Sequence, residues 1–357
     1  MFGVTGHPEK SIPREHDLDM MAADGAGEVQ HLSRLFRHSL RAGQIHPLLH
    51  VMQRRAGLQS GVQVALTEAP PRGPAGPSAH IDANLLRQKI VRLPSLPQAV
   101  LDVMRLLASE DATTSQITAR IERDQALTAR TLRIANSAFY GVPGRVATIH
   151  TAIGILGLRT VGTLFTTAAV SAQFTAAACP EFEFGRFWRH AIATALLARG
   201  LAQQLRMDED VAFTAGLLHD IGRLAMATQF PAETGQVLRY AHEADLLTLD
   251  AEGEMLDTDH VAVGVLIATH WHFPPAVIAA IEQHHVPVQS TAPAIADVVH
   301  VADAFAHALD PSASDDEMVP PVDLSAWARL GLAAAPCLVV LESTAAGVAG
   351  LCEALSL

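Results

Sequence analysis

The sequence predicts an all-α protein, and three observations support this. Apolar residues make up 49% of the chain but aromatic residues only 5%, and alanine is abundant. This mixture favours closely packed helices over a sheet of β-branched and aromatic residues. Apolar residues recur at three- and four-residue steps, as on one face of a helix, and no convincing series of alternating strands is found. The chain is long enough for one large or two medium domains.

Residues 1–78 are predicted to be an N-terminal extension. Within it, residues 28–53 are predicted as one helix, because Leu32, Phe36 and Leu40 recur at helical spacing. The segment 69–77 follows, with proline and glycine residues that a helix interior does not accept. This segment is the clearest predicted linker in the chain.

After the linker, helical patterns predict one domain over residues 79–310, with one lobe at about 79–178 and another at about 179–310. Helices are expected at 99–107, 115 to about 124, 127–135, 151–156, 161–172, 184–205, 210–228, 234–244, 260–270, 275–285 and 294–309. Residues 311–357 are predicted as a loop followed by terminal helices. The least polar window, 331–351, contains Pro336 and Glu342, which favour two packed helical pieces over a membrane span.

Charge and cysteine content exclude several function classes. Twenty-five basic residues against 37 acidic ones give a net charge of −12, so we expect no nucleic-acid binding through phosphate neutralisation. The cysteines, Cys179, Cys337 and Cys352, form no CxxC pair, and the first residues lack an apolar signal core. A cytoplasmic protein without membrane association is therefore expected. Because no Walker A, GxGxxG or GxSxG motif is present, we predict no organic cofactor.

The main chemical signal is a His-Asp pair, His219-Asp220, inside an apolar segment bounded by Gly216 and Gly222. A buried imidazole beside a buried carboxylate is costly unless both find partners, and a divalent metal satisfies both. Neighbouring residues on a helix point about 100° apart, so the pair is expected to approach one ion from two sides. Asp303 lies on an apolar helical stripe, where a carboxylate needs a cation or strong donors.

Seven residues are therefore candidate metal ligands. They are His190, His219, Asp220, His260, His284, His285 and Asp303. Taken singly, each histidine is more simply explained by a hydrogen bond to a carbonyl or carboxylate. Together, the four residues His190, His219, Asp220 and Asp303 suit a divalent ion such as iron, manganese or another transition metal. The remaining histidines of the helical domain are interpreted as surface or interface residues: His242, His270, His272, His300 and His307.

The order of the ligand candidates resembles the H…HD…D signature of the HD metal-dependent phosphohydrolases. With the three further histidines it is similar to the multi-metal HD-GYP type. However, His285 is followed by Val286-Pro287-Val288-Gln289, where an HD-GYP protein carries its acidic and Gly-Tyr-Pro loop. The absence of that loop argues against cleavage of cyclic dinucleotides.

A more specific resemblance is to the HDOD family, the HD-related output domain of bacterial signalling proteins. It covers roughly residues 80–310, with Asp257 as a departure where the family more often has glycine. The motifs that carry the resemblance are Leu93–Pro97, Asp124–Arg130, Asn136–Gly141, Ile149–Arg159, Asp259–Gly264, Trp271, Pro274 and His284-His285. The resemblance implies a two-lobed helical fold whose second lobe is built like an HD domain, generally without demonstrated enzymatic activity.

Two leading hypotheses follow from the residues and the resemblance. The first is a cytoplasmic bacterial signal-transduction protein that regulates other signalling proteins by direct contact, with a metal stabilising its second lobe; a homo-oligomer is left open. The second is a metal-dependent phosphohydrolase or phosphodiesterase acting on nucleotides or cyclic dinucleotides. Whether the chain is an enzyme stays uncertain, with the first hypothesis preferred. A weaker third hypothesis, a transcriptional regulator that contacts DNA, is disfavoured by the net charge of −12.

Overall fold

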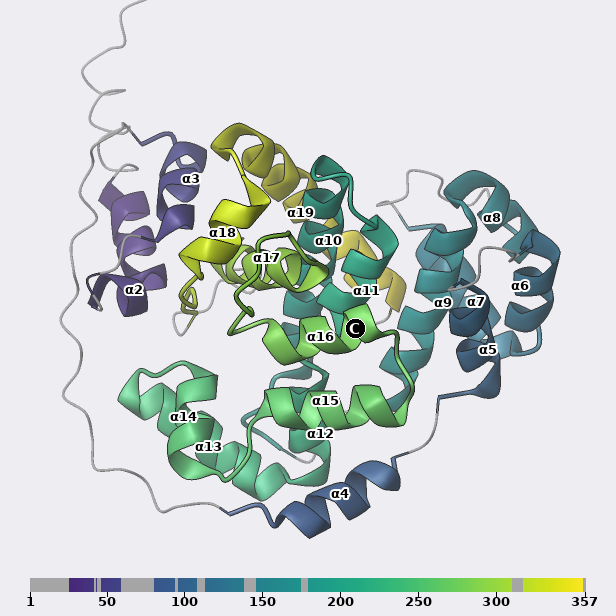
Figure 1. The fold of residues 1–357 in the computed structure, drawn as a ribbon, viewed down its shortest axis with the longest axis horizontal. Coiled ribbons are helices and arrows are strands. Elements are labelled where there is room, and N and C mark those ends of the chain that lie inside the picture. The colour runs from purple at the N-terminus through teal and green to yellow at the C-terminus, as the bar shows by residue number, and fades with distance from the viewer. Residues whose placement is uncertain are drawn as a thin grey trace, which may run out of the picture.

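The computed structural model describes residues 26–41, 43, 46–58, 80–93, 96–107, 113–137, 146–174, 179–309 and 317–355, and within them it contains helices and no strand (Figure 1). The predicted all-α class is confirmed. The predicted linker at 69–77 lies outside the described residues.

In the residues that the structure describes, the first lobe is a helical bundle, seen at the right of Figure 1. Its helices are α5 (Gln98–Leu107), α6 (Thr114–Ile121), α7 (Gln125–Ala135), α8 (Ile149–Leu156) and α9 (Leu158–Gln173). Asp124 begins α7 by accepting a hydrogen bond from the Leu127 amide. Such a side chain satisfies one of the amides that a helix start leaves free. Gly157 joins α8 directly to α9 at φ +88°, a backbone conformation that glycine adopts at little cost.

The second lobe is built around α10 (Phe184–Gln204), which packs against three other helices and buries residues on all its sides. Its neighbours are α11 (Glu209–Leu218), α17 (Ile295–Leu309) and α19 (Ala334–Leu355). The remaining helices of this lobe are α12 (Ile221–Gln229), α13 (Pro231–Ala244), α14 (Thr248–Met255), α15 (His260–His270), α16 (Pro275–Gln283) and α18 (Leu324–Leu330). Helix α4 (Ala83–Val91) packs on α15. Neither α4 nor α14 was among the helices predicted from the sequence.

Three segments are divided into helices differently from the prediction. The helix expected at 28–53 is broken into residues 26–35, α2 (Arg37–Arg41) and α3 (Pro47–Arg55). The first break is a turn at Phe36. The second lies between α2 and α3, where Gly43 has positive φ and Pro47 opens a new helix. The helix expected at 210–228 breaks at His219-Asp220, between α11 and α12.

The third correction concerns the apolar C-terminal window, which forms one helix instead of two pieces. Pro336 lies in the first turn of α19, where its missing N–H and fixed φ cost nothing. Of the described helices, only the Ala334–Glu353 stretch is long and apolar enough to cross a membrane by length and composition. In this structure 44% of that stretch is buried, and α19 packs against α10.

The helices of the N-terminal extension pack against the second lobe. The Leu35 carbonyl accepts a hydrogen bond from the Val319 amide at 2.8 Å. Arg37 is buried and forms an ion pair with Asp245, at 2.9 Å from its Nε to Oδ1. These contacts place α2 beside the turn between α13 and α14, at the left of Figure 1.

The buried side chain of His46 should make the folded protein less stable in mild acid. Its Nε2 donates to the Pro320 carbonyl at 2.9 Å and its Nδ1 accepts from the Leu48 amide, so the folded ring is neutral. Burial, together with the charge of nearby His300, lowers the pKa of His46 to about 4, although the Pro320 carbonyl opposes the shift. As pH falls through about 6.5, the unfolded chain therefore takes up this proton before the folded protein does. The free energy of unfolding then declines until pH 4.

We expect this proton uptake to remove about 3 kcal/mol from the free energy of unfolding between pH 6.5 and 4. Urea denaturation at several pH values measures it, with His46→Gln as the comparison. The variant is less stable at pH 7, and its stability should vary less over this interval. Parallel curves for the two proteins would contradict the assignment.

Candidate metal centre

His219 and Asp220 lie where the chain turns from α11 into α12. His219 still has helical angles, φ −52° and ψ −39°, whereas Asp220 has φ −100° and ψ 16°. The Nδ1 of His219 donates to the Gly216 carbonyl at 2.7 Å, which leaves Nε2 directed inward. Both side chains are buried. The break in the helix therefore directs two potential ligand groups into the interior of the second lobe.

His260 and His284 are oriented in the same manner by hydrogen bonds at their outer nitrogens. His260 is the first residue of α15, and its Nδ1 donates to Glu252 Oε2 at 2.6 Å. His284 follows α16, and its Nδ1 donates to the Ile281 carbonyl at 2.8 Å. Metal-binding histidines usually donate their second ring N–H to a carboxylate or carbonyl, which fixes the tautomer and leaves the other nitrogen free for the ion.

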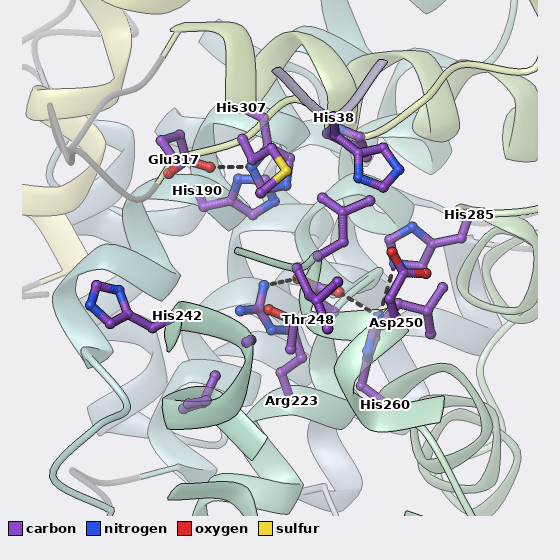
Figure 2. A pocket seen from close by; sticks show the side chains of 18 of the residues that line it. His38, His190, Arg223, His242, Thr248, Asp250, His260, His285, His307 and Glu317 are labelled. Atoms are coloured by element: carbon purple, nitrogen blue, oxygen red, sulfur yellow. Dashed lines mark hydrogen bonds and ion pairs between the residues drawn. The ribbon is translucent and has the colours of Figure 1, made fainter. Parts of the chain in front are cut away.

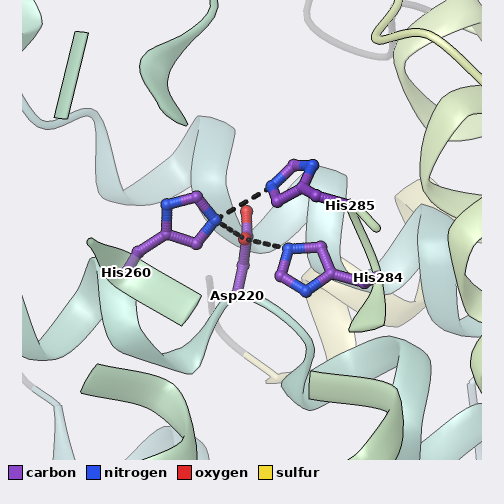
Figure 3. Close-up of side chains that lie close together, drawn as sticks. All are labelled: Asp220, His260, His284 and His285. Atoms are coloured by element: carbon purple, nitrogen blue, oxygen red, sulfur yellow. Dashed lines mark hydrogen bonds and ion pairs between the residues drawn. The ribbon is translucent and has the colours of Figure 1, made fainter. Parts of the chain in front are cut away.

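Four ligand candidates meet around Asp220 (Figure 3). Asp220 Oδ1 lies 3.4 Å from the Nε2 atoms of both His260 and His284. The Nε2 atom of His285 lies 3.0 Å from that of His260. One ligand atom from each of these four residues lies within 4.8 Å of all the others, a spacing that one ion can bridge.

The other three candidates continue this cluster. His190 Nε2, from α10, lies 3.0 Å from Asp303 Oδ1, from α17. His219 Nε2 lies 3.4 Å from both His190 Nε2 and Asp303 Oδ1. His190, His219 and Asp220 also satisfy the spacing of a metal-binding group. The structure thus brings all seven predicted side chains together, and their binding of metal stays a prediction.

The residues present fit a divalent ion. The buried Nε2 of His284 has no hydrogen-bond partner, and Asp220 Oδ1 lies 3.4 Å from it. The Nε2 atoms of His260 and His285 face each other, and such a pair can share only one proton. An unpartnered buried polar atom is costly, and a cation among these nitrogens would satisfy all of them. Imidazole and carboxylate donors together suit manganese, iron or zinc.

The electrostatics of the cluster are compatible with metal binding. Burial alone would raise the pKa of Asp220, but His219 and Arg223 hold it well below its usual range. Burial lowers the pKa of His284 and of His285, so both are neutral with lone pairs available. In the metal-free protein Asp220 and Asp303 outweigh burial and raise the pKa of His219 to about 9. His219 would therefore release a proton when a metal binds.

Sequence reasoning missed several residues that support the cluster. His300, predicted to be a surface or interface residue, is buried, and its Nδ1 donates to the His284 carbonyl at 2.6 Å. Glu252 orients His260, and Arg223 donates to Asp220 Oδ2 at 2.9 Å. His307 contacts His190. In the sequence, His307 follows Asp303 by four residues, which places both on one face of a helix and could have indicated that they are neighbours.

The cluster forms the floor of a pocket of about 620 Å³ (Figure 2). His190, Asp220, His260, His285 and Asp303 all line it. Its walls come from α2, from the turn between α13 and α14, from the start of α10 and from the segment at 317–321. Pockets of this size hold small molecules such as nucleotides.

Comparison with known proteins decides the family. A sequence model of the HDOD domain matches residues 93–287. This chain belongs to the HDOD family. The predicted resemblance and the two-lobed helical fold are thereby confirmed. Asp303, His307 and the segment at 317–355 lie beyond the matched residues.

Solved structures share the fold. An HDOD domain protein of unknown function from Geobacter sulfurreducens is 25% identical, with a TM-score of 0.66 over 76% of this chain and 97% of the other. A protein from Shewanella amazonensis SB2B, provisionally described as a phosphohydrolase, is 26% identical, with a TM-score of 0.62 over 76% of this chain and 98% of the other.

Curated relatives match only part of their own length. An uncharacterised protein of Treponema pallidum (strain Nichols) is 27% identical over 57% of this chain and 39% of the relative. Ribonuclease Y of Geobacillus thermodenitrificans (strain NG80-2) is 32% identical over 34% of this chain and 18% of the relative. This chain therefore spans well under half of either relative.

Proposed function

We propose that this HDOD protein is a metal-dependent phosphohydrolase that acts on a phosphoester bound in the pocket of Figure 2. One observation carries the proposal. The seven ligand candidates lie together, and five of them, His190, Asp220, His260, His285 and Asp303, line an open pocket instead of being enclosed in a sealed core. Two similar proteins support this reaction class by their names: the phosphohydrolase provisionally described from Shewanella amazonensis and ribonuclease Y, both of which denote hydrolysis of phosphoesters.

Different residues of the site would have different roles in the reaction. Asp220, His260, His284 and His285 would hold one divalent ion, and His190, His219 and Asp303 would extend the site beside it. A bound ion would supply Lewis acidity and a water acidic enough to serve as a nucleophile at neutral pH. Glu252 holds the His260 ring in place at 2.6 Å, and His300 fixes the backbone at His284. The pocket would confine the phosphoester to the face where these groups converge.

One observation favours the second candidate, a signalling protein that acts by contact with other proteins. The guanidinium of Arg223 already lies 2.9 Å from Asp220 Oδ2 and neutralises part of the cluster's negative charge. A buried cluster whose charge is partly neutralised in this way depends less on a bound metal ion for its stability. In that role the cluster would be a structural element and the pocket walls would present the contact surface.

Metal content and turnover, measured on one sample, test the proposal. Protein purified without chelator should contain transition metal, and it should hydrolyse at least one substrate of a phosphodiester and nucleotide panel. His219→Ala should lose metal and turnover together, because its Nε2 is within 3.4 Å of two other ligand groups. His150→Ala is the matched control, because His150 is an exposed histidine that neither lines the pocket nor belongs to a ligand group. Metal without turnover on the whole panel would favour the contact role, and absence of metal would refute the proposal.

A further inference from the structure

His307 lies next to the predicted ligands but is not one of them. It follows Asp303 by one turn of α17, and its Nε2 is 3.5 Å from Asp303 Oδ1. The ring centroids of His190 and His307 lie 4.3 Å apart, and Figure 2 shows the two side chains next to each other. One ligand atom from each of His190, Asp303 and His307 lies within 4.8 Å of the other two.

The outer face of the His307 ring is held by a buried carboxylate. Its Nδ1 bonds to Glu317 Oε1, and the other oxygen of Glu317 accepts from Arg186 at 3.0 Å. The backbone carbonyl of Glu317 in turn accepts from Arg37 of α2 at 2.8 Å. This arrangement repeats that of His260 with Glu252: a carboxylate accepts a hydrogen bond from Nδ1–H and leaves Nε2 facing a second carboxylate.

We infer that His190, Asp303 and His307 form a further position for a divalent transition-metal cation, beside the position at Asp220, His260, His284 and His285. The inference rests on the proposed metal centre but not on its hydrolytic activity. The side chain of His307 is 21% exposed and lines the pocket, so this position opens to solvent. Two imidazoles and one carboxylate suit the same borderline ions as the rest of the cluster.

Without a cation, the same contacts of His307 require a different protonation of its ring. To donate to both Glu317 and Asp303, His307 would have to carry a proton on each ring nitrogen. With a cation present, one proton on Nδ1 suffices and the Nε2 lone pair binds the ion. The two states differ in the number of ions that the protein holds, which can be counted.

The test is the number of Mn²⁺ ions bound by the full-length chain after removal of metal with chelator. Equilibrium dialysis against Mn²⁺ with elemental analysis gives the number and affinity of sites. We expect His307→Ala to bind one equivalent fewer than the unmodified protein, and His242→Ala, which alters another pocket histidine, to bind the same number. Glu317→Gln should keep the sites but weaken one of them by about 10- to 100-fold, since it removes the carboxylate that orients His307.

The outcomes separate this inference from the proposed function. Unchanged number and affinity in His307→Ala, with metal bound in the parent, would overturn the inference and leave the proposed metal centre intact. Loss of every ion in a folded His307→Ala would show that His307 has no separate position. A parent protein that binds no Mn²⁺ would refute both. If circular dichroism shows His307→Ala to be unfolded, Glu317→Gln decides, and an unchanged affinity profile in that variant overturns the inference.

Discussion

Gly222→Ala should lower the free energy of unfolding by about 4 kcal/mol, at the upper end of what single substitutions cost. A Cβ at Gly222 would lie 1.8 Å from the His260 carbonyl oxygen and 2.8 Å from the Gly264 amide nitrogen. Both are backbone atoms of α15, so no side-chain rotation relieves the clash. Helices α12 and α15 would have to separate, and this would move His260 away from Asp220.

Urea denaturation of the metal-free protein measures this effect, and Gly253→Ala is the matched control. Gly253 lies in α14, and a Cβ there meets no atom within 4 Å. Alanine at this exposed position should therefore stabilise the helix by about 0.5–1 kcal/mol. A Gly222→Ala protein as stable as its parent would contradict the close packing of α12 on α15.

Much of the fold follows from patterns that the sequence displays directly. The apolar stripes of α10 and α17 run at helical spacing, and they predicted both the helices and the inward position of His190 and Asp303, which are buried. The ligand set could be proposed because few residue types bind metals and their order matched a known signature. Their proximity was not visible in the sequence, since it depends on how distant helices pack.

The features that were missed have identifiable physical reasons. The break at His219-Asp220 has no proline, and the apolar pattern continues across it, so the segment resembled one helix. Glu252 lies on the unpredicted α14, where nothing distinguishes it from an exposed glutamate before folding. His307 was predicted to be a surface or interface residue, and its buried partner could not be predicted, because the position of the segment at 317–321, which supplies Glu317, is fixed only by tertiary contacts.

Asp220→Asn should remove most of the bound metal and reduce phosphoester turnover on the order of 10³-fold, the largest functional effect expected of any substitution here. Asp220 belongs to two ligand groups, the one with His190 and His219 and the one with His260, His284 and His285. An amide keeps the shape of the side chain but removes the negative charge that both groups use. Elemental analysis and the substrate panel measure the two losses.

The same substitution also tests how much Asp220 contributes without metal. Its carboxylate is buried beside Arg223, whose side chain is 25% exposed, so the unpaired guanidinium can be partly hydrated. We therefore expect a loss of about 2 kcal/mol in chelator, below the 3–5 kcal/mol typical of a fully buried pair. Asp297→Asn is the control, because Asp297 is a buried aspartate paired with Arg329. It should lose stability but retain metal, since Asp297 belongs to none of the three ligand groups. Full metal content in Asp220→Asn would show that the ions bind elsewhere, and the shared carboxylate would then serve only to hold Arg223.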